Sequence, residues 1–253
     1  MLRLDHFVIH IDNDLEKINQ LKKEFDKLNL PFEPQKGKGT KGFKVANFWV
    51  GEQYLELPYL KNLDGGGWKS EWVDKYNQGK RGIFGLCLFT DSLDEIKDGL
   101  IQRGLEIEGP ERITFSMLFG LFKKRLPFRT VYVKPIPNSG LQIFFLQMDS
   151  EEKYEFIKKF MKPNTQDVGV SSIYEAVVKK NFSNEEWTFI QKVFPQLIED
   201  EEQDKRTVDM GDTHLHFVST QDNLLKVDLH LKAEREEHKN KQIEIENVLL
   251  YFN

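Results

Sequence analysis

The feature that most constrains the fold of this chain is a recurring order of one strand, one helix and several further strands. In the first copy, residues 4–12 form a β-rich apolar run, and residues 15–28 place apolar side chains at intervals of three and four, as one helix face requires. Strand-like runs follow at 43–50 and 53–60, and a short strand is expected at 32–35. Because a repeat sets the architecture before any single motif does, we expect βαβββ modules.

Two further copies follow the same order. The second opens at residues 82–91, continues with a helical stripe at 93–100, and ends with strand-like runs at 105–107, 130–133 and 141–148. The third copy opens at 168–178, and its later strand candidates lie at 207–210, 214–219, 224–231 and 243–252, one strand more than the module needs. Residue pairs with capping-box spacing precede the three helices: Asn13 and Glu16, Ser92 and Glu95, Ser183 and Glu186.

The order of the copies predicts the domain organisation. We expect a paired-module domain at residues 1–149, a connecting helix and linker at 150–165, and a third, divergent βαβββ-like module at 166–253. The fold class is α+β. A lone third module has no partner inside the chain and would leave a sheet edge or face uncovered, so packing logic predicts a homodimer joined through third modules.

Composition excludes several classes of protein. A formal net charge of −5 does not supply the positive field that binds nucleic acid through its phosphates. No apolar run approaches the roughly 20 residues that cross a bilayer, and no signal peptide is expected. The single cysteine, Cys87, rules out an internal disulfide and a multi-thiolate zinc site. We therefore expect a cytoplasmic protein that contacts neither membrane nor nucleic acid.

Short motifs add a family resemblance. The sequence LDHFVI at residues 4–9 opens a strand, Asp12 precedes the helix, and YLEL at residues 54–57 closes the module. Together with the stretch from Gly39 through Asn47, this order resembles the glyoxalase-like group of the vicinal-oxygen-chelate superfamily, with good coverage over residues 1–149. The resemblance implies that two modules pair into a half-open barrel around a cavity. It also implies that metal-using members take ligands from the first and last strands of each module.

His6 and Glu56 occupy the two ligand positions of the first module in this resemblance. Alternation along a strand places His6 on one face with Leu4, Val8 and His10. One imidazole and one carboxylate make half of a site for a divalent metal such as Zn, Ni, Mn or Fe. The other half is missing, because Gly85 is expected at the position of His6 and Phe145 at the position of Glu56. The pair is thus either a metal site completed by other residues, a general base with its orienting carboxylate, or a satisfied polar contact.

Further side chains are expected to line the cavity or to lie outside it. Cys87 is expected to be a buried, inert thiol, and His214 and His216 to lie on a solvated or subunit-facing sheet surface. The expected cavity wall is Val8, His10, Tyr54, Cys87, Phe89 and Phe145.

Three functions remain open at this point. The first is a small-molecule enzyme with lyase, isomerase or dioxygenase chemistry, in which His6 and Glu56 are catalytic and assist a bound metal. The second is a non-catalytic protein of the same fold that binds or sequesters a small, planar or apolar ligand. The third is an assembly module whose last unit recruits a partner protein. Scaffold alone does not choose among them.

Overall fold

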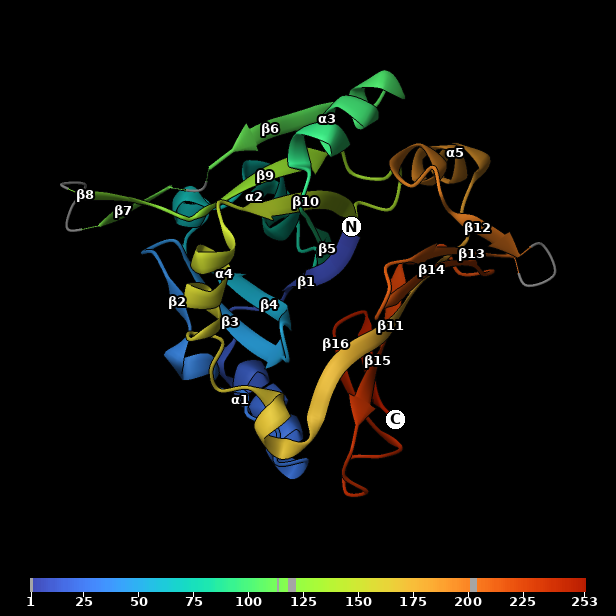
Figure 1. Ribbon diagram of the computed structural model, residues 1–253. Helices are drawn as coiled ribbons and strands as arrows, with labels where there is room; N and C mark the ends of the chain where they lie inside the picture. The colour runs from blue at the N-terminus through green and yellow to red at the C-terminus, as the bar shows by residue number, and fades with distance from the viewer. Residues whose placement is uncertain (1, 113, 118–121, 201–203) are drawn as a thin grey trace.

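Two mixed β-sheets carry the fold, one built from the first part of the chain and one from the last (Figure 1). The structure is a computed structural model that describes residues 2–112, 114–117, 122–200 and 204–253. The first sheet has eight strands in the order β2-β3-β4-β1-β5-β10-β9-β6, and the second has seven in the order β12-β13-β14-β11-β15-β17-β16.

The first sheet consists of two βαβββ units placed side by side. The elements of the first unit are β1 (Leu2–His10), α1 (Leu15–Lys27), β2 (Lys38–Gly39), β3 (Phe43–Val50) and β4 (Gln53–Leu60), with a short 3-10 turn at Pro34–Lys36 where a strand had been expected. Those of the second unit are β5 (Gly82–Thr90), α3 (Leu93–Gln102), β6 (Ile107–Glu111), β9 (Phe128–Val133) and β10 (Gln142–Met148). A 3-10 turn (Gly65–Gly67) and α2 (Ser70–Asn77) connect the units, and the hairpin of β7 (Thr114–Met117) and β8 (Phe122–Arg125) interrupts the second.

The pairing of strands shows the internal symmetry of this sheet. β1 runs parallel to β4, β5 runs parallel to β10, and the two units meet through the antiparallel pair β1–β5. The α+β class and the paired modules predicted from the sequence are confirmed. The sheet is curved but does not close into a barrel.

The second sheet repeats the same arrangement with fewer parts. After α4 (Glu151–Lys158) and a 3-10 turn (Thr165–Val168), its elements are β11 (Val170–Lys180), α5 (Asn184–Val193), β12 (Ile198–Asp200), β13 (Lys205–Asp209), β14 (His214–Ser219), β15 (Lys226–Ala233), β16 (Lys241–Ile245) and β17 (Val248–Phe252). β11 runs parallel to β14, β15 runs parallel to β17, and β11 and β15 form the antiparallel junction. Strands β15, β16 and β17 are therefore a fourth, truncated module, in which the turn between β15 and β16 replaces the helix.

This fourth module explains the surplus strand in the sequence pattern. It also removes the premise of the predicted homodimer, because the third module finds its partner inside the same chain. Homodimerisation consequently stays a prediction without its packing argument.

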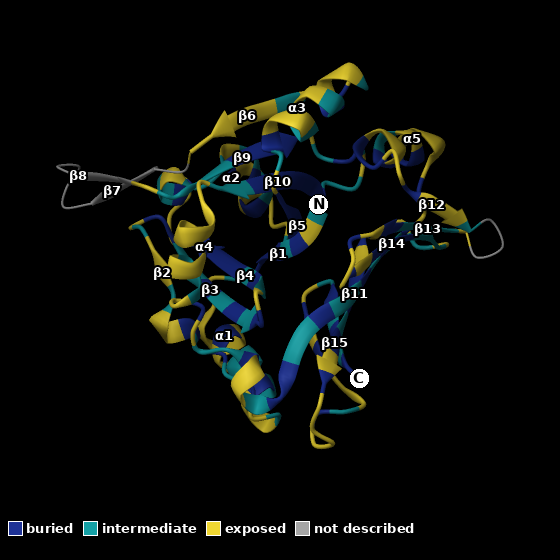
Figure 2. Ribbon diagram, viewed as in Figure 1, coloured by how far each residue is buried: buried dark blue, intermediate teal, exposed yellow. Residues whose placement is uncertain are grey.

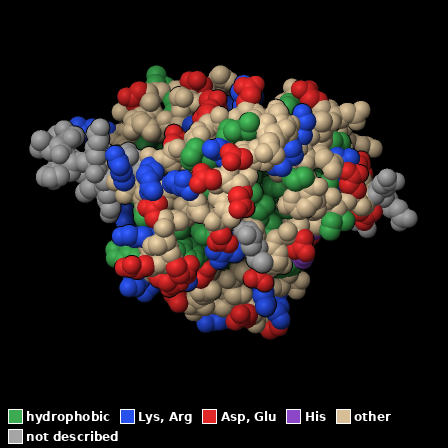
Figure 3. Space-filling view, turned by 45° about the horizontal axis from the view of Figure 1, so that its top comes forward, with side chains coloured by type: hydrophobic (Ala, Val, Ile, Leu, Met, Phe, Trp, Pro, Cys, Tyr) green, Lys and Arg blue, Asp and Glu red, His purple; other side chains and the backbone are tan. Residues whose placement is uncertain are grey.

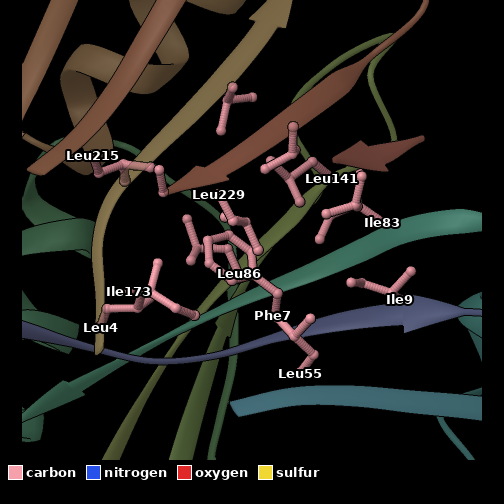
Figure 4. Close-up of a cluster of buried hydrophobic side chains, with 14 of the residues drawn as sticks. Leu4, Phe7, Ile9, Leu55, Ile83, Leu86, Leu141, Ile173, Leu215 and Leu229 are labelled. Carbon is pink, nitrogen blue, oxygen red and sulfur yellow. The ribbon is translucent and has the colours of Figure 1, made fainter. Parts of the chain in front are cut away.

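Apolar side chains join the two sheets. Leu4, Phe7 and Leu86 of the first sheet lie in one cluster with Leu215 and Leu229 of the second (Figure 4). Helices α1, α3 and α5 add their apolar stripes to the same cluster, and the central strands are the most deeply buried elements in Figure 2. The opposite face of the first sheet carries a separate aromatic cluster, which is described below.

Helix caps follow the sequence in part. Ser183 and Glu186 form the predicted capping box of α5. The cap of α1 is Asp14 instead of Asn13, and its carboxylate accepts from the N–H groups of Glu16 and Lys17. The side chain of Ser92 makes no capping hydrogen bond at α3.

Basic and acidic side chains are mixed on the surface (Figure 3), as they are mixed along the sequence. On the face shown in Figure 3, Lys and Arg side chains alternate with Asp and Glu side chains. Among the described residues, none of the helices combines the length and apolarity that a membrane crossing requires.

Asn247 connects the two halves of the molecule, the first containing the eight-stranded sheet and the second the seven-stranded sheet. Its Oδ1 accepts from the N–H of Ile83 at 2.8 Å, and its Nδ2 donates to the carbonyl of Leu225 at 2.8 Å. Gly82 makes this approach possible, because its φ is +94° and a Cβ there would lie 2.0 Å from Asn247 Oδ1.

We expect Asn247→Ala to lower the free energy of unfolding by about 2 kcal/mol, because it leaves a partly buried donor and acceptor without partners. Urea denaturation measures the change. The matched control is Asn223→Ala, an exposed residue of the same junction that should change stability little. Equal effects of the two substitutions would show that the Asn247 bridge contributes nothing specific.

Candidate active site

A β-bulge near the start of β1 creates the central contact of the site. The pairing of β1 with β5 shifts register between Leu4 and His6, so that Asp5 is an additional residue on its strand. The shift brings the side chains of Asp5 and His6 together, with His6 Nδ1 2.5 Å from Asp5 Oδ1. The carboxylate of Asp5 therefore holds the imidazole through Nδ1 and leaves Nε2 available.

Glu56 lies on the other side of the imidazole. His6 Nε2 is 4.0 Å from Glu56 Oε2, which is beyond hydrogen-bond distance but close enough for direct electrostatic interaction. The parallel pairing of β1 with β4 sets this approach, because His6 is opposite Tyr54 and Val8 is opposite Glu56. The structure thus brings His6 and Glu56 to one face of the sheet, and it adds Asp5 to them.

Aromatic rings enclose the imidazole. The ring of Tyr54 stacks on it with centroids 4.4 Å apart, and Phe144 contacts it edge-on at 5.4 Å. The side chain of His6 is 6% exposed, and that of Glu56 is 21% exposed. Solvent therefore reaches the pair mainly from the Glu56 side.

Burial shifts the ionisation of the groups around His6. Desolvation raises the pKa of Glu56, opposed by the nearby imidazole of His6 and assisted by the Asp5 carboxylate. Burial also raises the pKa values of the Tyr54 hydroxyl and the Cys87 thiol well above their usual range. Each shift favours the protonated form of its group more than solvent would.

A cluster of aromatic and apolar side chains covers the face of the first sheet on which the cavity was expected. It consists of Val8, Trp72, Phe84, Cys87, Phe89, Tyr132, Phe144 and Leu146. Val8, Cys87 and Phe89 thus lie on the predicted face. Phe145 does not: it is 1% exposed and packs in the large core on the opposite face, while Phe144 takes the place predicted for it. Leu4 also lies in the large core, because the bulge at Asp5 breaks the alternation that had grouped it with His6.

His10 shares the face of His6 but is sealed away from it. Its ring is completely buried, and its Nε2 accepts a hydrogen bond from Trp68 Nε1 at 3.1 Å. Its Nδ1 has no hydrogen-bond partner among the described residues. Burial, together with the charges of Arg81 and Lys75, lowers the pKa of His10 to about 3. A neutral, enclosed imidazole is part of the wall and cannot reach a ligand of His6.

The second unit offers no counterpart to the His6–Glu56 pair. A Cβ on Gly85 would lie 3.0 Å from Cη2 of Trp72 and 3.1 Å from the ring of Phe144. The ring of Trp72 therefore occupies the space in which a ligand from the second unit would stand. Phe144 lies opposite Cys87, as Glu56 lies opposite Val8, so an aromatic ring replaces the second carboxylate.

One cluster of candidate metal donors remains in the described part of the chain. Atoms of Asp5, His6 and Cys87 lie within 4.8 Å of one another. His6 Nδ1 is taken by Asp5, however, and the Cys87 thiol lies in a site that disfavours its ionised form. This donor set does not fit the site that the family resemblance implies, for which the second unit would have to supply half of the ligands.

A pocket of about 550 Å³ adjoins the cluster at Asp5. Phe89 and Tyr154 form part of its wall, and the guanidinium of Arg3 lies over the Phe89 ring at 4.3 Å. Ser171 and Thr213 from the second half complete the opposite wall. The second half thus contributes to the surroundings of the site, which the sequence did not indicate.

The second sheet carries a related pair with the two residue types exchanged. Strand pairing places Glu175 where His6 stands in the first sheet, because each is the residue that follows the bulge on its strand. It likewise places His216 where Glu56 stands. His216 Nε2 is 3.2 Å from Glu175 Oε1, and its Nδ1 is 2.8 Å from Thr207 Oγ1.

The solvated face expected for both histidines is correct for His214, which is 50% exposed, but His216 is buried. The sequence shows Glu175 and His216 on two strand-like runs of the third repeat. It does not show the bulge before Glu175 that brings the two side chains together.

Comparison with known proteins identifies relatives. A family model described as a glyoxalase-like domain matches residues 4–190. The crystal structure of a hypothetical protein from Staphylococcus aureus has a TM-score of 0.70 and 17% sequence identity, and the alignment covers 100% of this chain and 99% of that chain. At this identity the likeness shows the fold alone.

Two further structures match part of the chain. A hypothetical protein from Bacillus halodurans has a TM-score of 0.42 and 17% identity, covering 59% of this chain and 96% of that chain. Methylmalonyl-CoA epimerase from Mycobacterium tuberculosis has a TM-score of 0.41 and 15% identity, covering 59% of this chain and 89% of that chain. No curated protein matches the chain.

Proposed function

The chain belongs to the glyoxalase-like domain family, and from this premise we propose that it catalyses proton transfer on a small carbonyl compound, with His6 as base and Glu56 as acid. The observation that carries the proposal is the line of three polar groups, Asp5, His6 and Glu56, enclosed by aromatic rings. Such an enclosed group of interacting titratable residues is typical of catalytic sites.

Each residue has a separate task in the proposed reaction. With the Nδ1 hydrogen donated to Asp5, the lone pair of His6 lies on Nε2, and Asp5 is a positioning residue. His6 Nε2 takes a proton from the carbon next to the substrate carbonyl, and the electron pair of the broken C–H bond moves to the carbonyl oxygen. In the proposed step the carboxyl of Glu56, whose pKa is raised by burial, donates its proton to that oxygen, which gives a neutral enol. The imidazolium of His6 then returns its proton to carbon while Glu56 takes back a proton from a substrate oxygen, which restores both side chains. Return to the same carbon gives hydrogen exchange, and return to the neighbouring carbon of an enediol completes an isomerisation.

A non-catalytic binding protein is the second candidate. The observation that favours it is the aromatic surrounding of His6, which includes Tyr54 and Phe144, because ligand pockets are commonly lined by aromatic side chains. In that case the polar cluster would orient the ligand without transferring a proton.

Deuterium exchange distinguishes the two candidates. The purified protein is incubated in D₂O with a panel of 2-oxo acids, 3-oxo acids, 2-hydroxy ketones and thioesters, and NMR follows the C–H signals next to each carbonyl. Proton transfer predicts loss of one such signal at a rate well above the rate without protein. Binding without catalysis predicts a thermal shift with one of the compounds and no exchange.

Metal analysis of protein purified without chelator belongs to the same test. Exchange that persists with sub-stoichiometric metal supports the proposal. Stoichiometric Zn, Ni, Mn or Fe that is lost in both His6→Ala and Glu56→Ala would instead assign these two residues as ligands and overturn the acid–base roles. No exchange with any compound, together with no thermal shift, would remove both candidates.

Assembly and location remain expectations. We expect a homodimer and a cytoplasmic protein, the latter from the free, buried Cys87. Light scattering of the purified protein at several concentrations measures the first.

A further inference from the structure

A second pocket lies at the junction of the two halves, apart from the His6 site. Its volume is about 810 Å³. Lys75, Phe84 and the loop at residues 135–140 form the wall from the first half, and residues 223–226 with Asn247 form the wall from the second. The rings of Phe84 and His10 have centroids 4.1 Å apart, so Phe84 faces both the pocket and the aromatic cluster.

Cations dominate the charged residues of this junction pocket. It is lined by five basic side chains: Lys75, Lys80, Arg81, Lys180 and Lys226. Glu246 is the one carboxylate that lines it in the described part of the chain. Three of the cations are paired with acidic residues outside the lining, Arg81 with Asp12, Lys180 with Glu186, and Lys226 with Asp222. Lys75 and Lys80 are left to give the pocket its positive character.

Lys75 is a half-buried cation that forms no ion pair within the described part of the chain. Its Nζ donates to the carbonyl of Gly140 at 2.8 Å and contacts no carboxylate among the residues that the structure describes. It also lies 5.7 Å from the centre of the Phe84 ring. Burial and the charge of Lys69 lower its pKa, and the charge of Glu71 opposes this shift. An anion beside it would supply the missing compensation.

The walls of the pocket are held in place before any ligand arrives. Asn247 links Ile83 to Leu225 across the junction, and Lys75 is tied to the loop at Gly140. Binding to a preformed pocket loses little conformational entropy, so a few polar contacts are sufficient for specific recognition.

We propose that the junction pocket binds a small organic anion, a carboxylate or phosphate monoester with a flat apolar body. The anionic group pairs with Lys75 and Lys80, and the apolar body lies against Phe84 and Ile136, which also line the pocket. The proposal does not depend on the function of the His6 site, since none of Asp5, His6 and Glu56 lines this pocket.

Isothermal titration calorimetry with four compounds tests the proposal. Phenyl phosphate, benzoate, benzyl alcohol and benzylamine share a ring and differ in charge. We expect phenyl phosphate, benzoate or both to bind with 1:1 stoichiometry, and the relative affinity of these two identifies the anionic group. The alcohol and the amine should bind at least about 10-fold more weakly, because a charged hydrogen bond is lost.

Variants locate the binding. Lys75→Met removes the charge with little loss of volume and should weaken binding of the anion by about 10- to 100-fold. The matched control is Lys23→Met, an exposed lysine of α1 outside the pocket, which changes the net charge equally and should leave affinity unchanged. If Lys75→Met does not fold, Lys80→Met carries the test with a smaller expected loss.

Three results would overturn the proposal. One is equal affinity of the anions for the Lys75→Met and Lys23→Met proteins. Another is equal affinity of the wild type for benzyl alcohol and both anions, which would show an apolar site without anion recognition. The absence of binding by every compound would have the same consequence.

Discussion

Replacing His6 by alanine is expected to lower the rate of deuterium exchange by about 10²- to 10⁴-fold, the usual contribution of a positioned general base. The reason is that Nε2 of His6 is the group placed to take the proton, since Asp5 holds the other ring nitrogen. The Tyr54 hydroxyl and the Cys87 thiol do not replace it, because burial keeps both protonated. NMR exchange rates with the substrate identified from the panel measure the effect.

Two further variants separate a catalytic loss from a structural one. His6→Asn fills more of the space between Tyr54 and Phe144 than alanine does, so it should restore stability without restoring exchange. His216→Ala removes the imidazole of the corresponding pair on the second sheet and should retain wild-type exchange. A His6→Asn protein that keeps wild-type exchange while remaining folded would show that His6 is not the base.

Acid is expected to destabilise the protein through His10. The pKa of this buried imidazole is lowered to about 3, whereas an unfolded chain titrates at its ordinary value of 6.5. Between these two values the unfolded chain binds a proton that the folded protein does not. The free energy of unfolding therefore falls by about 1.4 kcal/mol for each pH unit below 6.5, and the full effect of this residue is about 5 kcal/mol at pH 3.

His10→Gln isolates this contribution. Glutamine is neutral at every pH and keeps an acceptor for Trp68 Nε1, so the variant should lose the slope that His10 adds. The comparison matters because Glu56, whose pKa is raised, acts in the opposite direction: its folded form holds a proton that the unfolded chain releases as pH rises above about 4.5. Urea denaturation at pH 7.5, 5.5 and 4.5 gives the difference between the two proteins.

The matched control is His214→Gln, an exposed histidine whose replacement should leave the slope unchanged. If wild type and His10→Gln lose stability in parallel between pH 7.5 and pH 4.5, the folded and unfolded states protonate His10 equally well and the prediction is wrong.

Much of the fold could be predicted from the sequence because the spacing of apolar residues shows which side chains of a strand or helix are buried. The strands at residues 82–91 and 43–50 and the helical stripe at 93–100 lie where their apolar patterns placed them. The fourth module was missed because it has no helix, and the repeat was recognised by its order of helix and strands. Strands β15 to β17 therefore looked like a surplus in the third module, although they pair as a module of their own.

The site was predictable only where alternation held. His6 and Glu56 were placed on one face because each lies on a strand with regular pairing to its neighbour. Asp5 was missed for the opposite reason: the residue before His6 should face away from it, and only the bulge turns the two side chains together. Phe145 and Phe144 were exchanged because the second unit was aligned through its loops, which do not fix the face of a strand.

The sequence by itself determined the module, the family resemblance and the two residues, His6 and Glu56, that we propose as base and acid. These depend on local periodicity and on residue identity, which a chain displays before it folds. The tertiary structure decided what surrounds them: the bulge that brings Asp5 to His6, the Trp72 ring beside Gly85, and the junction at which Lys75 donates to the carbonyl of Gly140. Each of these comes from contacts between segments far apart in the chain or from a local break in strand register, and neither is encoded in the spacing of residues along one strand or helix.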